Sequence, residues 1–169
     1  HLVAKLASPG GRIALFDLDQ CSSGKKNAFT LLAIPPQFAP CAGGGASLAV
    51  GQEKLAFPDC SSQHSRIIVL ELSSGSGVTV GPGTLPAWSP DGELLAYLGE
   101  DGIYMVRTGG NRGRLIVKYR SPDGGGESAF EGDWPPVPSW SPDGKWLVYH
   151  KCTLPAAPKT HCDRIEDFS

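Results

Sequence analysis

The sequence has few charged residues and no long apolar run, and each shortage excludes a class of protein. Charged residues make up 19% of the chain, and the formal net charge is −2. Because both signs are scattered along the chain, no basic surface is expected for nucleic acid or an anionic membrane. The longest apolar run, 28–34, has the length of a strand, whereas a membrane-spanning helix needs roughly 20 residues. We therefore expect neither nucleic-acid binding nor membrane insertion.

Motifs of two common kinds of active or phosphate-binding site are also missing. A hydrolase nucleophile usually lies in a Gly-x-Ser-x-Gly turn, and the Ser-Gly-Ser-Gly stretch at 74–77 lacks that spacing. The glycines at 43–45 are not followed by the Lys-Ser/Thr pair of a phosphate-binding loop. Turn carboxylates such as Asp91 and Asp143 are expected to accept hydrogen bonds from their own loops. The sequence thus predicts a protein that is not an enzyme and binds no cofactor.

Glycine and proline are abundant instead, with 22 and 15 residues in a chain of 169. Helical domains avoid so many of these residues, whereas all-β folds need them in their tight turns. With 40% apolar residues, the chain is also long enough to bury a substantial core. The composition therefore predicts an all-β fold.

A repeated motif, Pro-x-Trp-Ser-Pro-Asp-Gly-x-x-Leu-x-Tyr, is the main signal in the sequence. Its two copies cover 86–97 and 138–149, at a spacing of 52 residues. A weaker copy covers 47–57, with Phe57 in the place of Tyr97. In this motif the tryptophan is expected to end an inner strand, and Ser-Pro-Asp-Gly to form a turn into a second strand. Proline presets φ in such a turn, aspartate bonds the backbone, and glycine takes the position with positive φ.

Further strands are expected after each copy of the motif. Third strands are predicted at 67–72 and 103–106, and fourth strands at 78–80 and 114–119. Four antiparallel strands every 40 to 52 residues form the unit of a propeller blade. The sequence therefore predicts a β-propeller-type array of about four blades, at 1–36, 37–82, 83–136 and 137–169.

The end blades are predicted to be incomplete. The second, third and fourth strands of the first blade are expected at 2–7, 12–19 and 28–34. The third strand of the last blade is expected at 164–168. The first blade would then lack its innermost strand, and the last blade its outermost strand.

The repeat resembles that of TolB-type propellers, a family similar to WD-repeat proteins. The resemblance rests on Trp-Ser-Pro-Asp-Gly-x-x-Leu-x-Tyr at 88–97 and 140–149, and it implies structural roles for these residues. Propeller domains of prolyl-oligopeptidase-like peptidases are close relatives. A gating propeller, whose catalytic domain lies outside this chain, is therefore the alternative function. An enzyme that uses the propeller channel would need clustered histidines, and the four histidines here are scattered.

Incomplete end blades would present open strand edges, which are templates for pairing with another chain. Three explanations stay open: pairing between copies, a piece cut from a longer protein, and a small closed ring. A start at a histidine indicates a processed chain or a window from a longer one. Pairing between copies would be heterologous, and such contacts produce filaments. The candidate interface residues are Leu2 and Val3 on the first predicted strand, and Ile165 and Phe168 on the last. Trp134, in the loop 121–138, is the fifth.

Five cysteines in a β-rich chain predict an oxidising compartment, so we expect a secreted, extracellular or periplasmic protein. Cys41 is expected to begin an inner strand and Cys60 to end the strand paired with it, which brings both to one edge. Cys152 is expected to end a second strand and Cys162 to begin the third. Both pairs are therefore candidate disulfides. Cys21 is left as a free or intermolecular thiol.

Zinc is the alternative for the last hairpin, because His150, Cys152, His161 and Cys162 are suitable ligand types. Adjacent residues of a strand point to opposite faces, so His161 and Cys162 would diverge. A disulfide is therefore favoured over a metal site. Taken together, the sequence predicts a non-catalytic propeller scaffold that binds protein partners and copies of itself.

Overall fold

The computed structural model describes residues 2–6, 12–16, 29–41, 45–49, 52–118, 137–151 and 159–164. In these ranges the chain forms strands, which are joined by turns and loops. The strand bounds in chain order are β1 (Leu2–Leu6), β2 (Arg12–Phe16), β3 (Phe29–Leu31), β4 (Ser47–Ala49), β5 (Lys54–Asp59), β6 (Arg66–Glu71), β7 (Gly77–Pro82), β8 (Thr84–Trp88), β9 (Leu94–Leu98), β10 (Gly102–Arg107), β11 (Arg114–Lys118), β12 (Ser139–Trp140), β13 (Trp146–Lys151) and β14 (Lys159–Arg164).

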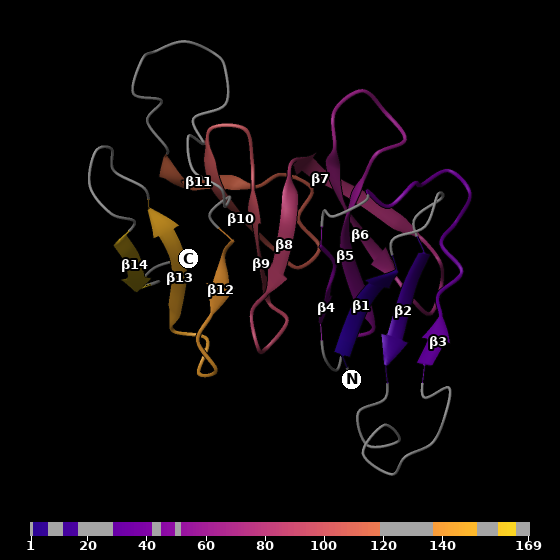
Figure 1. Cartoon of the computed structure of the whole chain (residues 1–169), viewed down its shortest axis with the longest axis horizontal. Helices are drawn as coiled ribbons and strands as arrows, with labels where there is room; N and C mark the ends of the chain where they lie inside the picture. Colours follow the sequence, from indigo (N-terminus) through magenta and orange to yellow (C-terminus); the bar gives the residue numbers. More distant parts are fainter. Residues whose placement is uncertain are drawn as a thin grey trace.

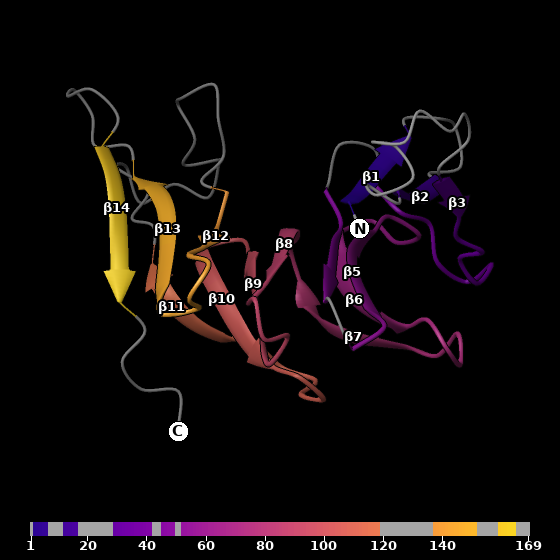
Figure 2. The same ribbon diagram turned by 90° about the horizontal axis from the view of Figure 1, so that it is seen from below.

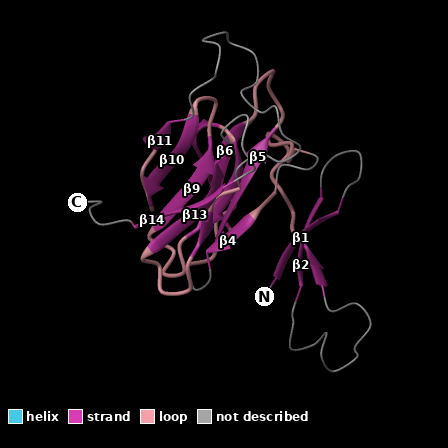
Figure 3. Ribbon diagram, turned by 60° about the vertical axis from the view of Figure 1, so that its left-hand side comes forward, coloured by secondary structure: helices cyan, strands magenta, loops and turns pink. Residues whose placement is uncertain are grey.

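The strands form four antiparallel sheets that follow one another in chain order (Figures 1 and 2). The two middle sheets have four strands each, in the orders β4-β5-β6-β7 and β8-β9-β10-β11. The first sheet, β1-β2-β3, and the last, β12-β13-β14, have three strands each. Figure 3 shows the described elements as strands and connecting loops. The predicted fold class is confirmed: the chain is an all-β array of antiparallel sheets, and in the described ranges the two end sheets have three strands instead of four.

Strand β6 shows why the sheets stack face to face. Its apolar residues are consecutive rather than alternating, because both faces of the sheet are covered. Ile67 and Val69 contact the cluster on one face, and Ile68 and Leu70 belong to the cluster on the other. Three of these side chains are almost completely buried. A run that is apolar at every position therefore indicates a sheet between two others.

Three apolar clusters lie at the three junctions between successive sheets. Ile13 of β2 packs with residues of β5 and β6 at the first junction. Trp88 and Tyr97 of the third sheet pack against the second sheet. Leu147 and Tyr149 of the last sheet pack against the third. The leucine and tyrosine of the repeat thus always face the preceding sheet.

The tyrosine of the first full repeat is held by close backbone contacts. Tyr97 is 2% exposed and stacks on Tyr104, with ring centroids 5.6 Å apart. A methyl group added at Gly113 would lie 2.1 Å from its hydroxyl, and one at Gly81 would lie 2.7 Å away. Burial, together with the nearby phenol of Tyr104, raises the pKa of Tyr97 to about 12. The ring therefore fills a slot that only glycine backbone leaves open.

The Ser-Pro-Asp-Gly turn is held by side-chain hydrogen bonds. Ser89 Oγ accepts a hydrogen bond from Leu94 N (2.9 Å) and donates one to Asp91 Oδ1 (2.5 Å). Asp91 Oδ1 also accepts one from Glu93 N (3.0 Å). The hydrogen bond from Ser89 lowers the pKa of Asp91 most, and that from Glu93 N adds to it. Gly92 takes the left-handed conformation at φ +72°.

The second copy of the turn repeats the same network. Ser141 Oγ accepts a hydrogen bond from Trp146 N (3.0 Å) and donates one to Asp143 Oδ1 (2.5 Å). Asp143 Oδ1 accepts one from Lys145 N (3.2 Å), and Gly144 has φ +70°. The aspartates of both motifs are therefore structural acceptors for their own turns.

The third strand of the last sheet differs from the prediction. It is β14, which pairs with β13 from Trp146↔Arg164 to Lys151↔Lys159. The prediction at 164–168 followed apolar side chains, whereas backbone pairing selects the polar segment immediately before it. Ile165 and Phe168 lie outside the described residues.

Replacing a core aromatic at the first junction should destabilise the whole array. Phe57 is completely buried and packs edge-to-face on Phe38, at a centroid distance of 6.2 Å. We expect Phe57→Ala to lower the free energy of unfolding by about 3–5 kcal/mol. Urea denaturation followed by tryptophan fluorescence measures this loss. Val78→Ala, at a side chain that is 50% exposed, is the control and should change it by less than about 0.5 kcal/mol. Equal effects of the two variants would contradict this assignment of the core.

Candidate functional site

A disulfide joins the segment before the second sheet to the end of β5. Cys41 and Cys60 are bonded, with their Cα atoms 5.0 Å apart, as one of the two predicted pairings has it. Cys41 N donates a hydrogen bond to Pro58 O (2.8 Å), and Cys60 N donates one to Ala39 O (2.7 Å). The cystine thus locks a short ladder in which Pro40 lies opposite Asp59.

Asp59 is the buried charge beside this disulfide, and no motif in the sequence marks it. Its side chain is fully buried. Oδ1 accepts hydrogen bonds from Ala39 N (2.6 Å) and Ser61 N (3.2 Å). Oδ2 accepts them from Ser61 Oγ (2.6 Å) and from Arg66 Nε (3.1 Å). Burial raises the pKa of Asp59, but the hydrogen bonds from Ser61, Ala39 and Arg66 together bring it below its ordinary value.

The other predicted cysteine pair is not brought together within the described residues. Cys162 does not begin its strand but lies inside β14, with its Cα opposite that of Val148. Cys152 and Cys21 lie outside the described residues. The pairing of Cys152 with Cys162, and the free or intermolecular thiol at Cys21, therefore stay predictions. In the part of the chain that the structure describes, no group of three or more His, Cys, Asp or Glu side chains is placed to hold a metal ion.

The predicted interface residues are only partly described. Leu2 and Val3 lie in β1, where they pair with Phe16 and Leu15 of β2. Trp134 lies outside the described residues. Strands β1 and β14 lie at opposite ends of the array (Figures 1 and 2). Over the described ranges, no helix is long and apolar enough to cross a membrane.

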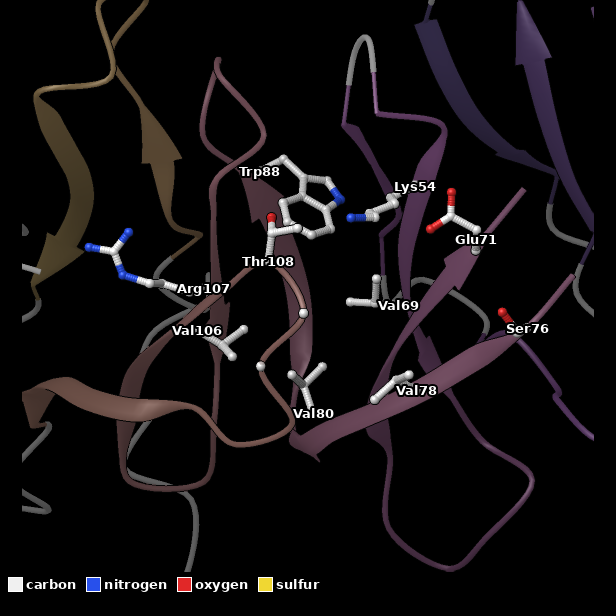
Figure 4. Close-up of a pocket in the computed structure, with 12 residues that line it drawn as sticks. Lys54, Val69, Glu71, Ser76, Val78, Val80, Trp88, Val106, Arg107 and Thr108 are labelled. Atoms are coloured by element: carbon white, nitrogen blue, oxygen red, sulfur yellow. The ribbon is translucent and has the colours of Figure 1, made fainter. Parts of the chain in front are cut away.

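A pocket that sequence reasoning did not predict lies between the second and third sheets (Figure 4). Its volume is about 180 Å³. Four valines from β6, β7 and β10 form its apolar wall, and Trp88 covers one side. Charged and hydroxyl groups complete the lining. The residues that line the pocket include Val69, Val78, Val80, Val106, Trp88, Lys54, Glu71, Arg107 and Thr108.

Sequence comparison assigns no family: no family model matches the chain. No curated protein matches it either. Structure comparison finds likeness to solved β-propellers. TolB from Acinetobacter baumannii matches with a TM-score of 0.65 and 16% identity, over 96% of this chain and 37% of that one. A chain of a nidogen/laminin complex matches with a TM-score of 0.60 and 15% identity, over 96% of this chain and 56% of that one.

Hydrazine synthase from Kuenenia stuttgartiensis matches with a TM-score of 0.55 and 16% identity, over 90% of this chain and 40% of that one. This chain therefore spans less than two thirds of the length of each similar structure. At such low identities the likeness shows the fold, that of a β-propeller.

Removing the carboxylate of Asp59 should make stability less sensitive to acid. Because the folded-state pKa is lowered, the carboxylate stabilises the fold above the pKa of the unfolded state, near 3.8. That contribution is lost as the pH falls through this value toward the lower folded-state pKa. We expect Asp59→Asn to cost about 2–4 kcal/mol at neutral pH and progressively less below about pH 4. Urea midpoints measured across this range test it, with the exposed Glu100→Gln as control; a cost that does not shrink with acid would contradict the prediction.

Removing the disulfide should lower stability through the unfolded state. The bond closes a loop with a sequence separation of 19 residues. A loop of this size corresponds to about 3 kcal/mol in the chain-entropy model. We expect the Cys41→Ser/Cys60→Ser variant to lose about this amount in urea denaturation. An unchanged midpoint would show that the bond does not constrain the unfolded chain.

Proposed function

We propose that this chain is a non-catalytic propeller scaffold that works outside the cytoplasm, binds proteins and pairs with copies of itself. The observation that carries the self-pairing is the strand count at the two ends of the array. Two middle sheets have four strands, whereas the first and last have three.

The order of the strands indicates which position is empty in each end sheet. In the complete sheets the chain enters at one edge, leaves at the other and passes directly into the next sheet; β7 leads to β8 across a single residue. By the same order, β3 is the outer strand of the first sheet, and no described strand takes its inner position. Strand β12 carries the motif tryptophan of an inner strand, and no described strand takes the outer position of the last sheet.

The edges of β1 and β14 beside these positions can pair between copies. Strands β1 and β14 lie at opposite ends of the array, too far apart to pair within one chain (Figure 2). An open strand edge presents unpaired N–H and C=O groups, which favour pairing with another strand. Pairing of β14 of one copy with β1 of the next repeats without closing, and therefore produces a linear assembly.

Two further observations support the location and the binding role. A disulfide between Cys41 and Cys60 is typical of proteins in oxidising compartments. One of the similar structures is a complex of nidogen with laminin, and such a complex supports protein binding as a use of this fold.

Self-pairing is tested by molar mass and imaging. We expect the purified chain to form oligomers whose mass rises with concentration in light scattering after size exclusion, and linear particles in negative stain. Leu2→Lys/Val3→Lys should shift the chain toward monomer, because lysines on an edge strand oppose edge pairing. Val78→Lys, on the outer strand of a complete sheet, is the matched control. A concentration-independent monomer, or equal effects of both variants, would refute self-pairing.

A further inference from the structure

We infer that the pocket between the second and third sheets is a binding site for an aliphatic carboxylate. This inference does not depend on self-pairing, because the pocket lies in the interior of the array rather than at its ends. It rests on three observations: the apolar wall, an unpaired buried donor and a cation beside that donor.

The apolar wall sets the size and shape of the ligand. Val80 and Val106 are 2% and 5% exposed, and Val69 and Val78 extend the same surface toward solvent. The volume of about 180 Å³ slightly exceeds the ~150 Å³ of an apolar cavity that holds benzene. The pocket therefore accommodates a branched aliphatic group of about five or six carbons.

The indole of Trp88 supplies a hydrogen-bond donor that lacks an acceptor. Trp88 is 8% exposed, and its Nε1 has no hydrogen-bond partner among the residues that the structure describes. Leaving a buried donor unpaired costs roughly 1–3 kcal/mol. In Figure 4 this nitrogen points toward the ammonium group of Lys54. An acceptor atom between these two groups would satisfy both.

The repeat provides an internal comparison for this donor. Trp140 holds the same motif position in the last sheet, and its Nε1 donates to Ala87 O across the junction (3.0 Å). At the preceding junction, Ser47 Oγ accepts a hydrogen bond from the backbone N of Trp88 instead (3.0 Å). The indole N–H of Trp140 thus bonds the third sheet to the fourth, whereas the indole N–H of Trp88, at the junction of the second and third sheets, is available to a ligand.

The charges of the lining favour an anionic acceptor. Lys54 lies opposite Glu71 in the strand pair, yet no salt bridge of Lys54 occurs among the described residues. In Figure 4 the ammonium group of Lys54 lies on the side of the indole nitrogen, whereas the guanidinium of Arg107 points away from it. Thr108 Oγ1 already donates to Gly92 O. A carboxylate therefore accepts from both Trp88 and Lys54, with charge-assisted strength on the lysine side.

Two kinds of ligand contain a carboxylate beside a branched aliphatic group: a free branched-chain acid and the C-terminal leucine of a protein. The probes are 4-methylpentanoate and the peptide acetyl-Gly-Gly-Leu, each with an uncharged control, 4-methylpentanamide and the C-terminal amide of the peptide. The readout is the set of indole N–H signals in ¹⁵N-labelled protein, with the Trp88 signal assigned by Trp88→Phe.

We expect a carboxylate probe to shift the Trp88 signal and to leave that of Trp140 in place, because Trp140 already has an acceptor. Lys54→Met should weaken binding about tenfold or more, and the exposed Lys145→Met should not. Tighter binding of the peptide identifies a protein C-terminus as the source, and tighter binding of the free acid identifies a small molecule. If neither carboxylate moves the Trp88 signal, if the amides bind equally well, or if Lys54→Met binds normally, the inference is overturned.

Discussion

The burial of both faces of each middle sheet is the constraint on which the rest of the structure depends. A sheet such as β4–β7 has apolar side chains on its two sides, so it is stable only between two neighbours. Each junction therefore stabilises two sheets at once, and no sheet in the interior of the array is an independent unit. In the described part of the chain the end sheets have a neighbouring sheet on one side only, and Trp146 of the last sheet is 40% exposed.

Most of the fold could be predicted from the repeated motif, because its residues form contacts with their near neighbours in the chain. Ser89, Asp91 and Gly92 close their turn with hydrogen bonds that span only a few residues, so the pattern is readable without knowledge of the neighbours. The bond between Cys41 and Cys60 was also predicted correctly, although Cys41 lies before the inner strand β4 rather than at its start. Strand β14 was misplaced because its pairing with β13 depends on backbone register. Here the paired segment is polar, so the apolar side chains used for the prediction did not indicate where the pairing lies.

The buried carboxylate, the unpaired indole and the pocket could not be predicted from the sequence. They depend on contacts between sheets, or on residues that no motif distinguishes. Asp59 is one of many acidic residues, and only its burial beside Ala39, Ser61 and Arg66 distinguishes it. Trp88 and Trp140 look equivalent in the motif, yet only the structure shows that the indole of Trp140 has an acceptor and that the indole of Trp88 has none within the described ranges. The pocket itself is the space that remains when two imperfect repeats pack together, and no single repeat encodes it.

The inner turns contact one another from sheet to sheet. The side chain of Gln52, in the turn of the second sheet, donates a hydrogen bond to Asp91 O in the turn of the third (3.1 Å), and Pro90 lies close to Gly144 in the next. The two full copies of the motif keep the same turn between their first two strands, although they are 52 residues apart. The long connection from β11 to β12 lies between them. A propeller of this kind can therefore acquire new recognition segments during evolution at its outer connections, without disturbing the register of its blades.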